Sequence, residues 1–220
     1  PPADYGSQVL SNVRVVDLST DVAGAFASKY FAAFGADVIK VEPRGGDPTR
    51  FETPRLGEGP EGGLLFAYLN TGKRSIVLDL ESPGGRADLR ALARDGDLLI
   101  AEGSPSRLTV LGLDATLLDE NPQLVLTCLS PYGQVGPYRE YRGNDLTSYH
   151  LGGLGRETPY NQVQDLEAEP PLVGGGFQSE YLTGWTAAAV SLAALAFRDR
   201  SGKGQAIDLG ALESVASMMR

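Results

Sequence analysis

The first half of the chain alternates short β-branched apolar stretches with stretches whose apolar residues recur at helical spacing. This alternation predicts strands joined by helices. Right-handed connections between such units favour a mostly parallel sheet that is covered on both faces. The fold class is therefore α/β, with a doubly wound, Rossmann-like sheet. The predicted strands are 13–18, 36–42, 75–80, 97–101 and 123–130, and the predicted helices are 22–34, 84–95 and 115–120.

Polar residues and glycines mark where these elements begin and end. Ser19, Thr20 and Asp21 offer side chains that could cap the helix predicted from residue 22, and Gly35 is a typical helix stop. The run 43–63 is rich in glycine and proline and predicts a long loop. Loops of this length in a compact domain are often functional.

The second half has a different pattern. Residues 144–152 predict a short helix, and 155–176 predict a loop because they include Pro159, Pro170, Pro171 and three successive glycines. An alanine-rich apolar helix over 181–198 is expected to be buried on most sides. A strand over 205–209 and a helix from 211 to 218 follow. The last helix has no stop signal, so we expect the chain to be part of something longer.

Composition narrows the possible functions. The chain has 220 residues, 42% of them hydrophobic, which is enough for a sizeable core. Its net charge of −9 argues against a surface for nucleic acid or anionic membranes. Cys128 and His150 are each the only residue of their type, so no intrachain disulfide and no metal site is expected. No apolar stretch approaches the ~20 residues of a membrane span, and a cytoplasmic protein is the expectation.

Several short motifs occur in one order along nearly the whole chain, and together they resemble the family III CoA-transferases. This family includes formyl-CoA transferase, carnitine CoA-transferases and α-methylacyl-CoA racemases. The resemblance implies an α/β large domain, a smaller second domain and two interlocked chains in a dimer. Residues 1–220 would be the amino-terminal part of the large domain, without the small domain and the carboxyl-terminal return. The motifs lie at 16–24, 35–50, 70–79, 132–138 and 200–205.

The implied reaction moves CoA from an acyl-CoA to a free carboxylic acid, and it needs a carboxylate nucleophile that forms anhydride and thioester intermediates. The family places an aspartate in the pattern Asp-x-x-x-Gly at the start of a long alanine-rich helix. Here Glu180 precedes Gly184 in that pattern. Glutamate reaches roughly 1.5 Å further, and a misplacement of about 1 Å can cost on the order of 10²-fold in rate. An acidic residue is also favoured at any helix start, so both interpretations of Glu180 stay open.

The resemblance also implies a set of CoA contacts. Backbone amides after the first strand lie along the cofactor in the family, a basic residue follows the second strand, and a later loop closes over CoA. For the basic residues, ordinary solvated charge is the alternative interpretation. The corresponding positions here are Val22, Ala23, Arg44, Asn70, Lys73 and Tyr132.

One segment departs from the family. Most members read Glu-Asn-Phe-Arg-Pro-Gly where this chain has Ala101 to Ser106, and Glu102 introduces an acid there. Val110 replaces a second family arginine, and Arg107 is the candidate substitute. Because each charge-assisted phosphate contact contributes roughly 1.5–3 kcal/mol, weaker CoA binding is expected.

Two alternatives to catalysis by Glu180 follow from these departures. The chain could be a non-catalytic scaffold half or subunit, paired with a second family member that carries the aspartate. If the chain instead carries the catalytic residue itself, a homodimer is expected. Racemase or isomerase activity is disfavoured, because Asn144 stands beside Asp145 where the racemases have a proton-transferring histidine, and asparagine cannot transfer a proton. Cys128 is interpreted as a buried hydrophobic residue and His150 as a structural one.

Overall fold

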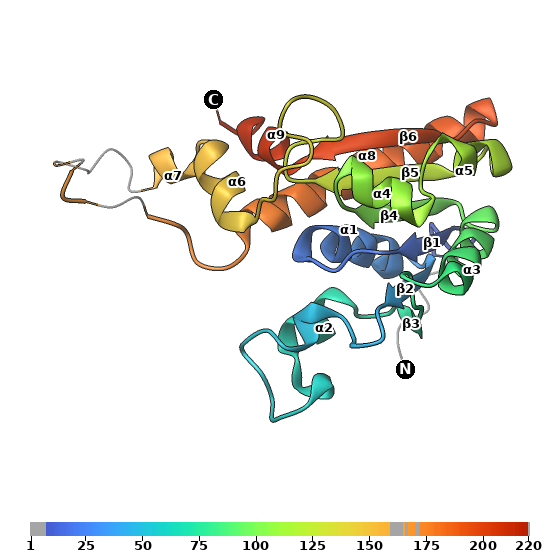
Figure 1. Cartoon of the computed structure of the whole chain (residues 1–220), viewed down its shortest axis with the longest axis horizontal. Helices are drawn as coiled ribbons and strands as arrows, with labels where there is room; N and C mark the ends of the chain where they lie inside the picture. The colour runs from blue at the N-terminus through green and yellow to red at the C-terminus, as the bar shows by residue number, and fades with distance from the viewer. Residues whose placement is uncertain (1–7, 159–164, 166, 170–171, 220) are drawn as a thin grey trace.

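All six strands of the central sheet run parallel, in the order β3-β2-β1-β4-β5-β6 (Figure 1). This order confirms the predicted doubly wound α/β fold. The computed structural model describes residues 8–158, 165, 167–169 and 172–219. The strands are β1 (Arg14–Asp17), β2 (Asp37–Glu42), β3 (Arg74–Val77), β4 (Leu98–Glu102), β5 (Val125–Ser130) and β6 (Gln205–Gly210).

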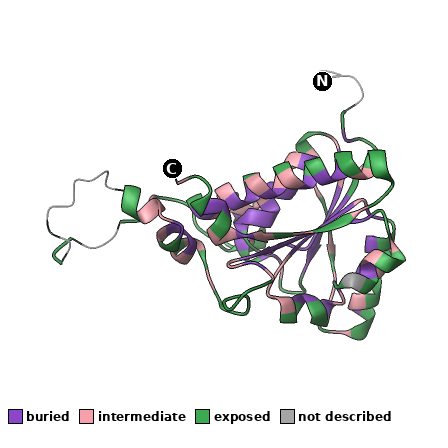
Figure 2. Ribbon diagram, turned by 90° about the horizontal axis from the view of Figure 1, so that it is seen from above, coloured by how far each residue is buried: buried purple, intermediate pink, exposed green. Residues whose placement is uncertain are grey.

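Helices cover both faces of the sheet because the side chains of the buried strands alternate between two apolar cores. Val15, Leu98 and Ile100 pack against α1 (Val22–Ala33) and α8 (Gln178–Ser201). Val16 and Leu99 point to the opposite face, which is covered by α3 (Pro83–Arg94), α4 (Pro105–Leu111) and α5 (Ala115–Glu120). Burial is accordingly concentrated in β1, β2, β4 and β5 and in the inner faces of the helices, while the edge strands β3 and β6 are more exposed (Figure 2).

Shorter helices extend the domain beyond the carboxyl ends of the strands. The loop 43–63 contains two 3-10 turns, η1 (Pro48–Arg50) and η2 (Pro60–Gly62), and is followed by α2 (Leu64–Leu69). On the other side lie α6 (Asp145–Leu151), α7 (Leu154–Glu157) and α9 (Ala211–Ala216). The sequence pattern did not predict α2 or α4, and the loop predicted from residue 155 was wrong at its start, where α7 runs to Glu157. Pro159, Pro170 and Pro171 of the predicted loop lie outside the described residues. Within the described chain no helix has the length and apolarity needed to cross a membrane.

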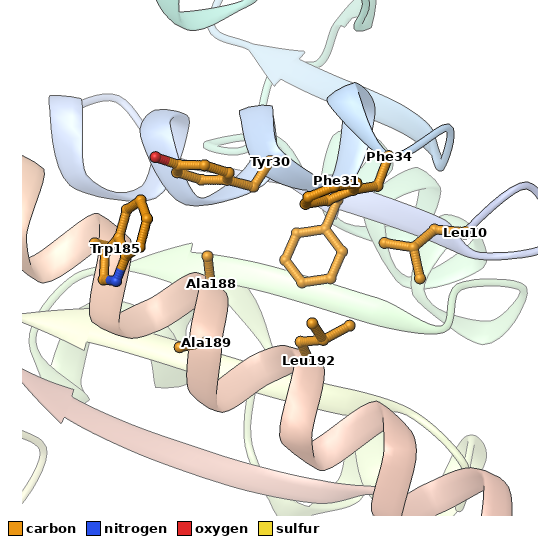
Figure 3. Close-up of a pocket in the computed structure, with 8 residues that line it drawn as sticks. All are labelled: Leu10, Tyr30, Phe31, Phe34, Trp185, Ala188, Ala189 and Leu192. Carbon is orange, nitrogen blue, oxygen red and sulfur yellow. The ribbon is translucent and has the colours of Figure 1, made fainter. Parts of the chain in front are cut away.

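The expectation that the alanine-rich helix is buried on most sides was wrong. Small residues, including Gly184, Ala187 and Ser191, form one buried face of α8 against α1 and the sheet. Trp185 and Leu192 on another face are 56% and 44% exposed. Together with Tyr30 and Phe31 of α1 and Phe34 directly after it, they line an apolar groove between the two helices (Figure 3). Alanine raises the mean hydropathy of the whole helix, but only the face with a partner in this chain is covered.

Candidate active site

A cleft of about 590 Å³ lies over the carboxyl ends of β4 and β5, beside the starts of α1 and α8. From β1 the chain continues to β2 and β3 on one side of the sheet, whereas from β4 it continues to β5 and β6 on the other side. The connections after β1 and β4 therefore run in opposite directions and leave a crevice between these two strands. Ligands of open α/β sheets bind at this kind of switch point. Asp21, Glu102 and Glu180 line the inner part of the cleft, and Arg107, Glu140 and Arg142 also line it.

Glu180 lies in the first turn of α8, and Asp145 of α6 caps that turn. The Asp145 Oδ1 atom accepts hydrogen bonds from the backbone N–H groups of Ser179 (2.8 Å) and Glu180 (3.2 Å). The Glu180 carboxyl then reaches across to α1, where its Oε2 accepts a hydrogen bond from the Val22 N–H at 2.9 Å. The candidate nucleophile is therefore held at its backbone by the Asp145 side chain of α6 and at its carboxyl by a backbone amide of α1.

Gly184 explains why the pattern Glu-x-x-x-Gly places a carboxyl here. Residues four apart share one helix face, so Glu180 and Gly184 both face α1. A Cβ atom at Gly184 would lie only 2.4 Å from the Ala23 carbonyl oxygen. The missing side chain lets α8 approach the α1 backbone, and this close approach brings Glu180 to the Val22 amide.

Glu102, and not a side chain of the loop before α1, accepts hydrogen bonds from amides just before α1 and from one in its first turn. Its Oε2 accepts from the N–H groups of Thr20 (2.9 Å) and Asp21 (3.0 Å), and its Oε1 accepts from Gly24 N–H (2.8 Å). The Asp21 side chain forms no cap hydrogen bond. The predicted capping by Ser19, Thr20 or Asp21 side chains was therefore wrong, because an acid from the neighbouring strand occupies those donors.

The inner part of the cleft favours protonated carboxyl groups. Burial, together with the charges of Asp21 and Glu102, raises the pKa of Glu180 to about 8, against the opposing hydrogen bond from Val22. Burial and the charge of Asp21 raise the pKa of Glu102 to about 7. Such displaced pKa values at a concave site are typical of functional carboxyl groups.

Comparison with known proteins identifies the family to which the chain with this cleft belongs. Residues 10–220 match the family model described as CoA-transferase family III. The chain belongs to CoA-transferase family III. It is 36% identical to a succinyl-CoA:(R)-benzylsuccinate CoA-transferase subunit of Thauera aromatica over 95% of this chain and 50% of that protein. It is also 36% identical to a succinate–glutarate CoA-transferase of Agrobacterium fabrum, over 96% of this chain and 52% of that one.

Solved structures of the family share the fold. The chain superposes on a CAIB/BAIF family protein from Brucella suis with a TM-score of 0.87 and 30% identity, covering 97% of this chain and 56% of that one. The chain thus spans about half the length of the curated relatives it matches.

The predicted CoA contacts of this family III chain fall into two groups. Ala23 and Arg107 line the cleft beside Glu180, and Val22 contributes the amide that binds Glu180. Arg44 lies outside the cleft lining, is largely exposed, and pairs with Asp79 at 3.4 Å. Tyr132 is half-buried next to Tyr138, with 6.1 Å between ring centroids. The structure therefore brings together part of the predicted set.

Lys73 and Asn70 lie beneath α1 in a buried polar cluster. The Lys73 ammonium contacts Asp17 Oδ2 (2.9 Å), the Ala25 carbonyl oxygen (2.8 Å) and Asn70 Oδ1 (2.8 Å). Three acceptors use the three N–H groups of a lysine ammonium. A direct contact between Lys73 and a phosphate would have to break these bonds. This geometry argues for a structural role, and binding of CoA by Lys73 stays a prediction.

Sequence reasoning missed several residues that line the cleft. Tyr141, Arg142 and Ser130 all line it, and the Ser130 hydroxyl is buried with no hydrogen-bond partner among the described residues. Ser130 ends β5, the strand next to β4, and a polar residue at the carboxyl end of a strand beside the switch point is the signal that could have identified it. Arg142 follows a tyrosine in a loop and carries no comparable signal.

The residues weighed for racemase chemistry have structural roles in this chain. Asn144 caps α6 by accepting from Thr147 N–H at 3.1 Å, and Asp145 caps α8. His150 lies near the end of α6, outside the cleft lining. Burial raises the pKa of the Cys128 thiol to about 12, as expected for a buried hydrophobic residue.

Proposed function

We propose that this chain forms the nucleophile-bearing half of a CoA-transferase that moves CoA from an acyl-CoA to a free carboxylic acid. The observation that carries the proposal is the Glu180 carboxyl, bound by the Val22 N–H at the switch-point cleft of a family III fold. CoA and acyl-CoA are substrates in this scheme. The acids in the names of the relatives, a benzylsuccinate, succinate and glutarate, suggest dicarboxylic acids as the substrate class.

The Glu180 carboxylate would attack the thioester carbonyl, form a C–O bond and release the CoA thiolate, which leaves a mixed anhydride. The thiolate then attacks the Glu180 carbonyl, so the donor acid leaves and a Glu180–CoA thioester forms. The acceptor carboxylate repeats these steps in reverse and regenerates Glu180. During attack at the Glu180 carbonyl, negative charge develops on an oxygen that already faces the Val22 N–H. A backbone donor in place before the reaction stabilises that charge.

The proposal includes a paired assembly and a cytoplasmic location. The relative from Thauera aromatica is named as a subunit, which supports either a homodimer or a second family member as the partner of this chain. The scaffold alternative also has a supporting observation, because a carboxyl with a pKa of about 8 is mostly protonated at neutral pH and then is a poor nucleophile. A free, buried cysteine fits a reducing compartment.

Covalent trapping separates the enzyme from the scaffold. Full-length protein is incubated with succinyl-CoA and then with hydroxylamine or borohydride, and the modified residue is identified by mass spectrometry. We expect modification at Glu180 only when the thioester is supplied, and loss of both modification and CoA exchange in Glu180→Gln. Glu120→Gln, which removes an exposed carboxyl that pairs with Arg90 and Arg94, is the matched control and should react normally. Exchange that persists in Glu180→Gln would exclude the proposed role.

A further inference from the structure

Glu102 joins β4 to the start of α1 by accepting three backbone hydrogen bonds, two from residues just before the helix and one from its first turn. Its two oxygens accept from Thr20, Asp21 and Gly24 at 2.8–3.0 Å. The fit is tight, because a Cβ atom on Gly24 would lie 2.6 Å from Oε1 of Glu102 and 2.5 Å from the Ser19 Cβ. The carboxyl is therefore pressed directly against the turn, with no room for another side chain.

The same turn also binds Glu180. The Val22 N–H lies between the amides that Glu102 holds, and it donates to Glu180 Oε2 at 2.9 Å. Two carboxyl groups from β4 and α8 thus share one helix start. We propose that Glu102 is a positioning residue for Glu180: it fixes the turn that presents the Val22 N–H, and its negative charge opposes the ionisation of Glu180. The inference rests on the proposed function only in its consequence for catalysis.

The charged groups around the pair are mostly acidic. Glu180 is influenced by Asp21 from the loop before α1, by Glu102 from β4 and by Asp145 from α6. Lys40 of β2 is the cation that acts on Glu102, but its ammonium is already 2.7 Å from Asp47. Arg107, which lines the cleft, pairs with Glu81 at 2.8 Å. Neighbouring carboxylates disfavour a second ionisation, so Glu102 and Glu180 should titrate as an interacting pair.

This arrangement predicts a definite sign for the pH dependence. A carboxyl that loses a negative neighbour releases its proton more easily, so its pKa falls. Replacing Glu102 by glutamine should therefore lower the pKa of Glu180 from its raised value of about 8. Because only ionised Glu180 can attack a thioester, the rate should rise with pH, and this rise should move to lower pH in the variant.

The direct test follows Glu180 itself. Full-length protein labelled with ¹³C at the glutamate Cδ is titrated by NMR, and the Glu180 signal is assigned by its loss in Glu180→Gln. In Glu102→Gln we expect the midpoint of Glu180 to fall by about one pH unit. Glu140→Gln removes another cleft carboxyl, one that accepts a hydrogen bond from Ser106 of α4, and should leave the midpoint in place. An unchanged midpoint in natively folded Glu102→Gln would overturn the proposal.

A second variant keeps the test decisive if Glu102→Gln does not fold. Glu102→Asp retains the charge with a shorter reach, so the Glu180 midpoint should stay above neutrality, and a midpoint near the ordinary glutamate range would contradict us. The titration needs no substrate. If Glu180 is never trapped by hydroxylamine but still responds to Glu102, the proposed function fails and the positioning role stands. If Glu180 is trapped but its midpoint does not move in Glu102→Gln, the proposed function stands and the positioning role of Glu102 fails.

Discussion

Helices α1 and α8 build two unlike surfaces from one contact. At their starts, Gly184 lets the α8 backbone touch Ala23, and the polar groups of both helices converge on Glu180. On their outer flank, large aromatic side chains of α1 meet Ala188, Ala189 and Leu192 of α8 across an apolar groove of about 250 Å³ (Figure 3). The size of the side chains at the contact decides which surface forms. Where the backbones of α1 and α8 lie close together, backbone N–H donors come next to carboxyl groups. Where large side chains hold the two helices apart, an apolar groove is left between them.

The two surfaces also differ in whether their side chains find partners within this chain. Carboxyl groups at the polar end accept hydrogen bonds from backbone amides of the turn before α1 and of α1 itself. On the flank, Trp185 and Phe34 stay 56% and 52% exposed. The Glu102 and Glu180 carboxyl groups thus have partners within this chain, while the flank has covered only part of its apolar surface.

The largest expected effect is a loss of stability, and it compares a core residue of α8 with a groove residue of the same helix. Leu195 is 3% exposed and Leu192, on the groove, is 44% exposed. Leu195→Ala should lower the free energy of unfolding by about 2–5 kcal/mol because it leaves a cavity in the core. Leu192→Ala should cost on the order of 1 kcal/mol or less. Denaturant unfolding of full-length protein measures both, and equal losses would show that the groove is as fully packed as the core.

The sequence predicted the core better than the polar end. Periodicity identified every strand and the helices 22–34 and 181–198, because burial on a sheet imposes alternation and burial on a helix imposes 3.6-residue spacing. Spacing from Gly184 also located Glu180. The role of Glu102 could not be predicted, because it depends on β4 lying next to β1 and on a carboxyl reaching amides more than seventy residues away in sequence. The exposure of α8 was misjudged because composition does not say which faces have partners.

Gly184→Ala should displace Glu180 at the polar end, and it should lower the free energy of unfolding by less than Leu195→Ala does. The added Cβ would meet the Ala23 carbonyl oxygen at 2.4 Å, so the helices must separate. Overpacking of this kind costs about 1–3 kcal/mol, and moving Glu180 by about 1 Å should slow CoA transfer on the order of 10²-fold. Gly84 in α3 has open space around its Cβ position and is the matched control. Gly84→Ala should leave transfer unchanged and stabilise the fold by about 0.4–1 kcal/mol.

The smallest expected effect tests whether the two surfaces are coupled. Edge-to-face aromatic contacts run from Tyr181 to Phe26, from Phe26 to Tyr30 and from Tyr30 to Trp185, with ring centroids 4.8–5.2 Å apart. This row connects the polar end of the helix pair to its apolar flank. Tyr30→Leu removes two of the three contacts, those to Phe26 and Trp185, and should cost about 0.5–1.5 kcal/mol beyond the change in buried area.

Trp185 is the only tryptophan among these 220 residues, so the part of the emission that is lost in Trp185→Phe reports on the flank. Tyr30→Leu should change the emission of Trp185, because the tyrosine ring 5.2 Å away no longer covers one edge of the indole. CoA exchange should be unchanged, since Glu180 is positioned by Val22, Asp145 and Gly184 and not by the aromatic row. Tyr138→Leu, which alters a tyrosine pair in a different loop, controls for nonspecific effects and should leave the emission constant. A fall in exchange that accompanies the change in Trp185 emission would mean that the flank and the polar end move together, and the two surfaces would then have to be treated as one.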